Sequence, residues 1–291
     1  MSWGVALAGN AGNPSWQRVL SELSSSGLTA LELGPVGYLP EDSYVAREAL
    51  EARRLTAVGS FLFESLHDPS CRDHVLAVAK RACRAIAGVG GRLLVIIDRP
   101  GRERAATAGR SDAARRLSTP RWLILLDTIN AVAEIAHECS LQPCFHPHAG
   151  SFVEFRDEID RLLADTDLPL CLDTGHAAFA DIEPEHALRA YAPRLRHVHL
   201  KDVDGAVCHR VKHHRLGYWA ALSAGIFSPL GCGIVGVERV LTTLDEIAYT
   251  GIATIEQDRA AGMGTPLADL RHSLAFLRGA GLAVPAEKPL N

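Results

Sequence analysis

Short apolar segments alternate with amphipathic segments along the whole chain. Apolar runs of about 4–8 residues between turn-forming residues are typical of buried strands, and apolar positions spaced three or four residues apart are typical of helices. The pattern predicts strands at residues 4–8, 30–33, 57–62, 93–97, 142–146, 169–173, 197–200 and 253–256. It predicts helices at residues 16–25, 44–53, 73–87, 124–139, 155–164, 184–191, 237–247 and 266–279.

This alternation also predicts how the segments pack. Strands that alternate with helices form βα units and a parallel sheet, and eight such units close into a (β/α)8 TIM barrel. No shift in composition marks a domain boundary, so we expect residues 1–291 to form a single barrel domain. Two long irregular stretches, 98–120 and 203–232, follow predicted strands and should lie at the face of the barrel where active sites are built.

Polar residues follow each of the last four predicted strands. The strand ends carry Phe-His-Pro-His-Ala-Gly at 145–150, Leu-Asp-Thr-Gly-His at 172–176, His-Val-His-Leu-Lys-Asp at 197–202 and Ile-Glu-Gln-Asp at 255–258. Neighbouring strands lie about 4.8 Å apart, so side chains that point inward from these ends can meet at one point. Two imidazoles and two carboxylates would meet there, from His146, Asp173, His199 and Glu256.

A mixed set of nitrogen and oxygen donors suits a divalent ion such as Mn²⁺, Co²⁺, Mg²⁺ or Zn²⁺. No thiolate belongs to this set, and a chelating substrate needs open positions on the ion, so we favour Mn²⁺ over a closed structural zinc. His148 and Glu154 are alternatives to His146 as the fourth ligand. His148 shares a strand face with His146, and Glu154 follows a few residues later.

Other polar residues have both a structural and a functional interpretation. His197 shares a strand face with His199 but lies one layer deeper, where it would be a core residue or would support a ligand. Asp202 could hold a ligating histidine or pair with Lys201. Glu32 ends the second predicted strand and could face the floor of the pocket.

Charge and cysteine content narrow the function classes. Lysine and arginine total 30 against 34 aspartate and glutamate, and the net charge of −4 argues against a surface that binds nucleic acid. The 7 cysteines include no CxxC pair, which favours a reduced, intracellular protein. We find no signal-peptide pattern and no apolar run long enough for a membrane span, so we expect a cytoplasmic protein. The arginine-rich run at 99–121 predicts a solvated loop.

The strand-end motifs resemble those of the xylose isomerase-like TIM-barrel superfamily. Three further segments share the resemblance: Glu-Leu-Gly-Pro at 32–35, Gly-Tyr-Leu-Pro at 37–40 and Phe-Ser-Pro-Leu-Gly at 227–231. Within this superfamily, these motifs are most similar to the branch that contains inosose dehydratase. The resemblance implies a metal held by Glu, Asp, His and Glu at strands five to eight. Asp173, His199 and Glu256 match the last three places, whereas His146 stands at the first. This departure argues against a two-glutamate epimerase and favours the dehydratase-like branch, which carries a His-x-His on strand five.

The resemblance also implies roles for residues around the ion. It implies that His148 acts on the substrate, and Glu154 matches a substrate-contacting glutamate of some epimerases. A base, His148 or Glu154, would take the proton next to the ketone, and an acid, His148 or His176, would protonate a leaving hydroxyl or the other carbon. Lys201 would steady the developing oxyanion. We expect three residues to bind the substrate: Glu32, His176 and Lys201.

The expected function is that of a metal-dependent lyase that dehydrates a keto-inositol (inosose) or a related keto-sugar through an enolate. The alternative is a sugar or ketosugar isomerase or epimerase that acts by α-proton transfer, because both reactions share the enolate. A metal-dependent DNA-repair enzyme and a non-catalytic binding barrel are rival classes, and the net charge opposes the first. We expect a small polyhydroxy ketone as the substrate, and we expect no nucleic acid and no membrane as partners. The sequence leaves open whether the chain forms a homo-oligomer.

Overall fold

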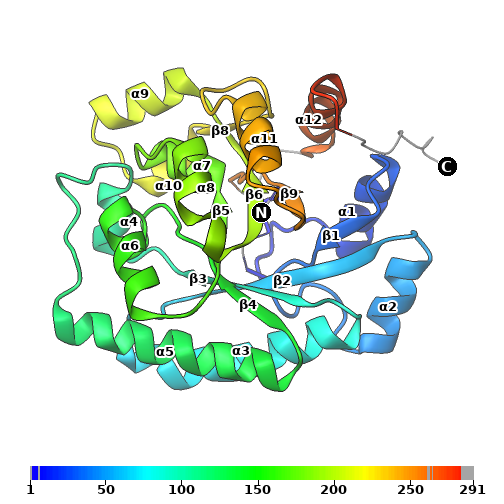
Figure 1. Cartoon of the computed structure of the whole chain (residues 1–291). Helices are drawn as coiled ribbons and strands as arrows, with labels where there is room; N and C mark the ends of the chain where they lie inside the picture. Colours follow the sequence, from blue (N-terminus) through cyan, green and yellow to red (C-terminus); the bar gives the residue numbers. More distant parts are fainter. Residues whose placement is uncertain (1, 6, 261–262, 264, 283–291) are drawn as a thin grey trace.

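The computed structural model describes residues 2–5, 7–260, 263 and 265–282 and is an α/β barrel (Figure 1). Among these residues, seven parallel strands form one sheet in the order β1-β2-β3-β4-β5-β6-β9. Their bounds are Ala30–Glu32 (β1), Thr56–Glu64 (β2), Leu93–Asp98 (β3), Gln142–Phe145 (β4), Leu170–Asp173 (β5), Leu195–Leu200 (β6) and Ala253–Ile255 (β9). The predicted TIM-barrel fold is confirmed, with seven strands in a nearly closed sheet.

The main helices lie around the outside of the sheet (Figure 1). They are α1 (Trp16–Ser25), α2 (Ser43–Glu51), α3 (Arg72–Gly88), α5 (Thr119–Glu138), α6 (Arg156–Asp165), α8 (Pro184–Tyr191), α11 (Val237–Glu246) and α12 (Leu267–Gly279). The start of α5 at Thr119, earlier than the predicted residue 124, is compatible with Pro120 because proline is tolerated in the first helical turn. None of the helices in the described part of the chain combines the length and apolar character that a membrane span requires.

Burial on both sides of the strands explains why the sequence forms these elements. β3 is buried along its whole length, as expected of a strand in a parallel sheet that is covered on both faces. The buried face of α3, which packs against α5, includes Val75, Ala79, Cys83 and Ile86. Full burial of an aliphatic side chain such as Ile86 contributes about 1.5–3 kcal/mol, so this face holds the helix in place.

The segment predicted as the first strand, residues 4–8, departs from the prediction. Ala6 lies outside the described residues, and the other four residues form no strand. Gly4 has φ +72°, a left-handed conformation that interrupts an extended backbone, and Leu7 is 44% exposed although Val5 is buried. In the described part of the chain, β1 and β9 do not pair with each other, so the sheet is open between them.

The two stretches predicted to be irregular carry short elements instead. Residues 98–120 include α4 (Arg102–Thr107), and residues 203–232 include α9 (Gly205–His213) and α10 (Tyr218–Ser223), which contacts α4. β7 (Asp202–Val203) pairs antiparallel with β8 (Phe227–Ser228). A further short helix, α7 (Thr174–Phe179), begins directly after β5. These elements follow the carboxyl ends of strands, so they surround the polar strand ends described next.

Candidate active site

The four predicted ligand residues stand where strands of the sheet end. His146 follows β4 directly, Asp173 is the last residue of β5, His199 lies in β6 and Glu256 follows β9. Asp173 and His199 are register partners, which places their side chains next to each other. One ligand atom from each residue lies within 4.8 Å of the others. The structure therefore brings together what we call the outer cluster: His146, Asp173, His199 and Glu256.

Short distances join the members of the outer cluster. Asp173 Oδ2 lies 3.6 Å from His146 Nε2 and 3.7 Å from His199 Nδ1. Glu256 Oε2 lies 2.8 Å from His199 Nδ1. Asp173 Oδ1 accepts hydrogen bonds from the N–H groups of Gly175 and His176, both at 2.8 Å, and so caps α7. This cap fixes the carboxylate, and Oδ2 is left facing the histidines.

The two histidines of the motif after β4 are oriented by backbone carbonyls. His146 Nδ1 lies 2.8 Å from Pro147 O, and His148 Nδ1 lies 2.9 Å from Ala149 O. A carbonyl oxygen only accepts, so each Nδ1 carries the proton and each Nε2 keeps a lone pair. His146 Nε2 is thereby suited to bind an ion, and His148 Nε2 is suited to accept a proton.

Lys201 is a fully buried cation beside the outer cluster. Its Nζ lies 2.8 Å from Asp173 Oδ2, 3.0 Å from Asp258 Oδ2 and 3.2 Å from Glu256 Oε2. Burial by itself would lower the pKa of Lys201, but the three carboxylates, Asp173 first, hold that pKa well above its usual range. Burial would also raise the pKa of Asp173, but the ammonium group holds it well below its usual range. The lysine and its partners are therefore charged.

The charges around the centre leave an anionic excess. Burial opposes ionisation of the carboxylates, yet Lys201 or His199 holds each carboxylate pKa well below its usual value. Burial likewise opposes the imidazolium form of His199, yet Glu32 and then Glu256 hold the pKa of His199 well above its usual value. The ionised groups are four carboxylates and two cations: Glu32, Asp173, Glu256, Asp258, Lys201 and His199. Two negative charges remain, and this excess favours the binding of a cation.

A second buried group lies next to the outer cluster. One ligand atom each from His148, His176 and Asp258 lies within 4.8 Å of the others, and the two imidazole centroids are 4.0 Å apart. Burial, followed by the charge of Lys201, lowers the pKa of His176 to about 4, and burial also lowers the pKa of His148 well below its usual range. Ala149 N–H donates to His176 Nδ1 at 3.2 Å, so the proton of neutral His176 is on Nε2. Both rings are neutral near pH 7.

Asp258 and Tyr218 belong to this second group and are absent from the predicted site residues. Tyr218 OH lies 3.4 Å from Asp258 Oδ2 and 3.5 Å from His148 Nε2. Asp258 stands two residues after Glu256, so the period of two along an extended chain offers a signal for it. Tyr218 comes from α10, and no spacing in the sequence connects that helix to the strand ends.

Glu32 lies against the back of the outer cluster. Its Oε1 accepts from His199 Nε2 at 3.0 Å and from His197 Nε2 at 2.9 Å. A carboxylate in this place fixes the ring of a ligating histidine and sets its tautomer. Glu32 also lines the cavity, so its predicted substrate contact stays a prediction. His197 lies deeper and is buried, at the place expected of a supporting residue.

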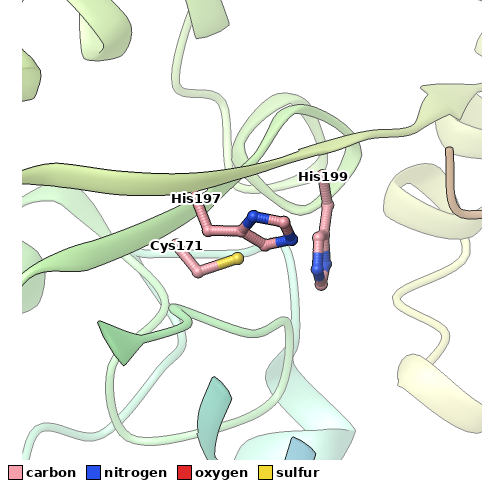
Figure 2. Close-up of side chains that lie close together, drawn as sticks. All are labelled: Cys171, His197 and His199. Carbon is pink, nitrogen blue, oxygen red and sulfur yellow. The ribbon is translucent and has the colours of Figure 1, made fainter. Parts of the chain in front are cut away.

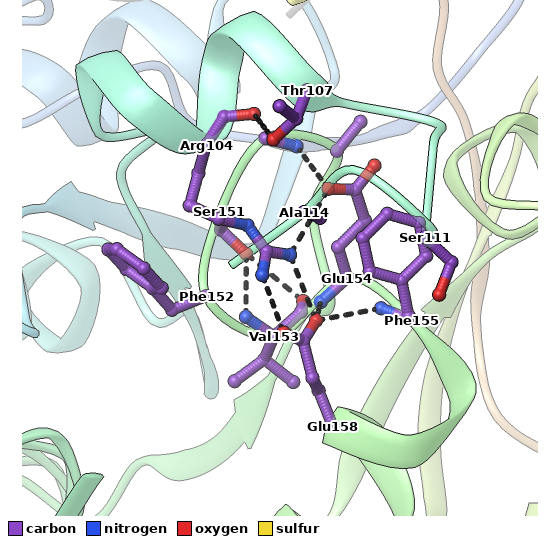
Figure 3. A network of polar contacts seen from close by, with 12 residues as sticks. Arg104, Thr107, Ser111, Ala114, Ser151, Phe152, Val153, Glu154, Phe155 and Glu158 are labelled. Carbon is purple, nitrogen blue, oxygen red and sulfur yellow. Dashed lines mark hydrogen bonds and ion pairs between the residues drawn. The ribbon is translucent and has the colours of Figure 1, made fainter. Parts of the chain in front are cut away.

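Glu154 lies in a different network (Figure 3) and does not line the cavity. Its carboxylate accepts from Gly109 N at 2.6 Å and Gly150 N at 2.9 Å and lies 3.4 Å from Arg104 Nη2. Burial raises the pKa of Glu154 to about 7. Arg104 belongs to the run predicted to be solvated, yet it is fully buried and pairs with Glu158 at 2.6 Å. A buried carboxylate needs donors, and Glu154 finds them toward α4 rather than toward the outer cluster.

Asp202 neither holds a ligating histidine nor pairs with Lys201 among the contacts of the described residues. Its two oxygens accept from four backbone N–H groups at 2.9–3.0 Å, those of Val203, Gly231, Gly233 and Val235. A Cβ on Gly233 would lie 2.3 Å from Asp202 Oδ1, which explains why a glycine stands there. Asp202 therefore orders the loop after β8.

A cavity of about 370 Å³ opens onto the site. Its polar end is lined by residues of both groups, including His146, His148, His176, Lys201 and Asp258. Its other end is lined by apolar side chains from α1, β1 and α12. Sites for small ligands have volumes of about 300–1,000 Å³, with a few polar groups placed to orient the ligand. The cavity is therefore suited to a small molecule whose polar groups face the histidines.

Known proteins resemble this chain over most of its length. The inosose dehydratase of Geobacillus thermodenitrificans is 26% identical over 260 residues, which cover 88% of this chain and 86% of that protein. The solved structure of the probable 3-DHS dehydratase of petrobactin synthesis from Bacillus anthracis gives a TM-score of 0.72 at 15% identity and covers 94% of this chain and 96% of that one. The solved structure of the 3-keto-D-glucoside 4-epimerase from E. coli gives a TM-score of 0.70 at 17% identity. The match covers 93% of this chain and 97% of that one. These two structures show a shared fold.

A family model described as the xylose isomerase-like TIM barrel matches residues 20–280. The match includes every strand of the sheet and all four residues of the outer cluster. The predicted resemblance is confirmed, and so is the expectation of an enzyme of the dehydratase or isomerase/epimerase type. The chain belongs to the xylose isomerase-like TIM barrel family.

Proposed function

We propose that the protein is a metal-dependent lyase that dehydrates a keto-inositol (inosose) or a related keto-sugar. One observation carries the proposal: the outer cluster, with its anionic excess, lies in one cavity with His148, whose Nε2 keeps a lone pair. Relatives named inosose dehydratase, at 26% and 28% identity, support the substrate class. The cavity is large enough for a six-membered polyol ring.

The residues of the outer cluster fit a divalent ion. Two imidazole nitrogens and two carboxylate oxygens suit Mn²⁺, Co²⁺, Mg²⁺ or Zn²⁺, and we favour Mn²⁺ because no thiolate belongs to the set. In the described residues Asp173 Oδ2 is buried and has ion-pair contacts but no aligned hydrogen bond, so it keeps lone pairs for an ion. When bound, the ion would polarise the ketone oxygen and stabilise the negative charge of an enediolate.

His148 is the proposed base. Its Nδ1 proton is held by Ala149 O, so Nε2 can take the proton from the carbon next to the ketone. The electron pair of that C–H bond then forms the enediolate. When the C–O bond of the neighbouring hydroxyl breaks, the protonated His148 returns its proton to the leaving oxygen, and water departs. One histidine thus serves both halves of the elimination.

His176 and Lys201 are the proposed contacts to substrate oxygens. His176 Nε2 lies 3.3 Å from Asp258 Oδ2. Because Nε2 carries the proton, it can donate a hydrogen bond to a substrate hydroxyl that enters beside Asp258. The Lys201 ammonium group lies among the carboxylates and can steady a developing oxyanion nearby. Glu32 acts through His199 in this scheme, because both imidazole contacts of its Oε1 lie behind the outer cluster.

The test is incubation of the Mn²⁺-loaded enzyme with a keto-inositol and with keto-sugars in D₂O, followed by NMR and mass measurement of the products. A product that has lost water supports the proposal, and His148→Ala should then lower kcat by at least about 100-fold. The exposed His186 supplies a matched control, since His186→Ala should leave kcat unchanged. A deuterated isomer of otherwise unchanged composition would instead identify the alternative, an isomerase or epimerase, in which the neighbouring His176 completes the proton transfer. No turnover of any such ketone would overturn both.

A further inference from the structure

A second set of side chains of the types that bind metals lies behind the outer cluster. Figure 2 shows Cys171, His197 and His199 close together, with the His197 ring directed at the His199 ring. One ligand atom from each of these three residues lies within 4.8 Å of the others, and all three are buried. Glu32 lies beside this group, because its Oε1 lies 2.9 Å from His197 Nε2 and 3.0 Å from His199 Nε2. We call Cys171, His197 and His199 the inner cluster.

The strand register explains why two clusters are stacked. Cys171 is the register partner of His197, and Asp173 is the register partner of His199. Residues two apart on a strand point to the same face, so the first pair lies one layer below the second. The inner cluster therefore repeats the arrangement of the outer cluster deeper in the barrel, with a thiol in place of the carboxylate of Asp173.

His199 belongs to both clusters through opposite ring nitrogens. Its Nδ1 faces Glu256 Oε2 at 2.8 Å on the outer side, and its Nε2 faces Glu32 Oε1 at 3.0 Å on the inner side. On the inner side the two imidazoles and the Cys171 thiol form a set of two nitrogens and one sulfur, with the Glu32 carboxylate next to both histidines. Such a set, with a thiolate among its donors, suits Zn²⁺ and ions of similar preference, and it does not suit Mg²⁺ or Mn²⁺.

We propose that the inner cluster is a second, deeper cation site that takes a thiophilic divalent ion such as Zn²⁺, Cd²⁺ or Co²⁺. On binding, the thiol of Cys171 loses its proton to solvent and its sulfur bonds to the ion. The Nε2 protons of His197 and His199, which face Glu32, also go to solvent, and with an ion in each cluster His199 bridges the two ions as an imidazolate. This site goes beyond the proposed dehydration, because Cys171 and His197 take no part in that reaction, and the two sites share His199. Thiophilic ions therefore bind this protein in a place that Mn²⁺ does not occupy.

The test uses Co²⁺ as the probe, because a cobalt–thiolate bond gives a strong charge-transfer absorption in the near ultraviolet. Titration of the wild-type protein with Co²⁺ should give this absorption and a stoichiometry of about two ions per chain, one for each cluster. Cys171→Ser should remove the absorption and reduce the stoichiometry to about one. The exposed Cys232, which lies 3.2 Å from His272, is the matched control, and Cys232→Ser should keep the absorption.

Two further measurements keep the result decisive. X-ray absorption of the Co²⁺-loaded wild-type protein should show sulfur in the shell of ligands, so the proposal does not depend on the folding of any variant. Glu256→Gln weakens the outer cluster and should leave the thiolate absorption intact, which separates this site from the proposed activity. The proposal is overturned if wild-type protein shows no sulfur ligand, or if the absorption disappears in Cys232→Ser and persists in Cys171→Ser.

Discussion

His146 and His148 show how a single hydrogen bond decides what a side chain can do. Each ring donates a hydrogen bond from Nδ1 to the carbonyl oxygen of the next residue. The N···O distance is 2.8 Å for His146 and 2.9 Å for His148. The Nε2 of each ring is then left for the role that we propose, which is binding an ion for His146 and accepting a substrate proton for His148. Under this proposal the same residue type, two positions apart, serves two purposes.

His146 is the unusual member of the ligand set, and its role can be tested against Glu154. We expect His146→Ala to weaken Mn²⁺ binding by at least about 100-fold, because loss of a partner behind a ligand already costs about 10–100-fold. Glu154→Gln should leave Mn²⁺ affinity unchanged, because the Glu154 carboxylate binds Gly109 and Gly150 instead. Isothermal titration with Mn²⁺ measures both affinities. The reverse order of effects would make Glu154 the fourth ligand and show that the loop after β4 rearranges.

Gly175 makes room for the stem of Lys201. A Cβ at position 175 would lie 2.6 Å from Lys201 Cγ and 2.9 Å from Lys201 Cβ, and atoms so near the backbone cannot swing aside. We expect Gly175→Ala to lower the free energy of unfolding by about 1–3 kcal/mol through overpacking. Urea titration followed by circular dichroism measures the change. Gly279 is the control, because a Cβ there would meet nothing within 4 Å, and Gly279→Ala should be neutral or slightly stabilising. Equal stability of the two variants would contradict the close contact.

At the scale of elements, the strand ends were the most predictable part of the site. Asp173, His199 and Glu256 each follow or end a short apolar run, and in a parallel sheet such ends meet at one edge, so local pattern and global geometry agree. The prediction of a first strand at residues 4–8 is wrong, because an apolar run does not reveal that Gly4 adopts a left-handed conformation. The sequence did not predict Tyr218, because a tertiary contact of α10 brings it to His148 and no spacing along the chain indicates that contact. Long-range packing of this kind leaves no mark in a single sequence.

Glu154 links two elements, and its position predicts a pH dependence of stability. Its folded-state pKa of about 7 lies above the ordinary value of 4.5, so the folded protein keeps this proton when the unfolded chain has lost it. The stabilising contribution of the bound proton is complete below about pH 4.5 and is lost as the pH rises to about 7. One pKa unit corresponds to about 1.4 kcal/mol, so the loss is on the order of 3 kcal/mol.

The measurement is urea unfolding of wild-type protein and Glu154→Gln at pH 5 and pH 8. The wild-type protein should lose more stability than the variant between the two values, because the variant has no proton to release at this place. The difference between the two proteins isolates Glu154 from groups that titrate in both. Glu185→Gln, on the distant helix α8, should follow the wild-type dependence. Identical slopes for wild type and Glu154→Gln would show that the carboxylate is ionised throughout.

At the scale of the whole molecule, the outer cluster joins strands that are distant in the sequence. Its members lie in or directly after β4, β5, β6 and β9, so an ion that binds them would hold four of the seven strands of the described sheet together. The gap between β1 and β9 lies beside Glu256, where the sheet has no paired strand in the described residues. A bound ion would tie Glu256 to the strands on its closed side and would stabilise the barrel next to its opening.

Metal removal should therefore destabilise the entire barrel. An ion at a concentration of 100 times its Kd adds about 2.7 kcal/mol to the free energy of unfolding, and for a chain of this size that corresponds to a rise in Tm of about 5 °C. Thermal unfolding of wild-type protein with excess Mn²⁺, compared with the same protein in a chelator, should show this rise. Glu256→Gln should abolish most of it, because one of the two ligand carboxylates is neutralised. Glu246→Gln, which breaks only an exposed pair with Arg189, should keep the full rise. If Mn²⁺ raised Tm equally in both variants, the ion would be bound elsewhere, and the link between the strand ends and the proposed chemistry would be lost.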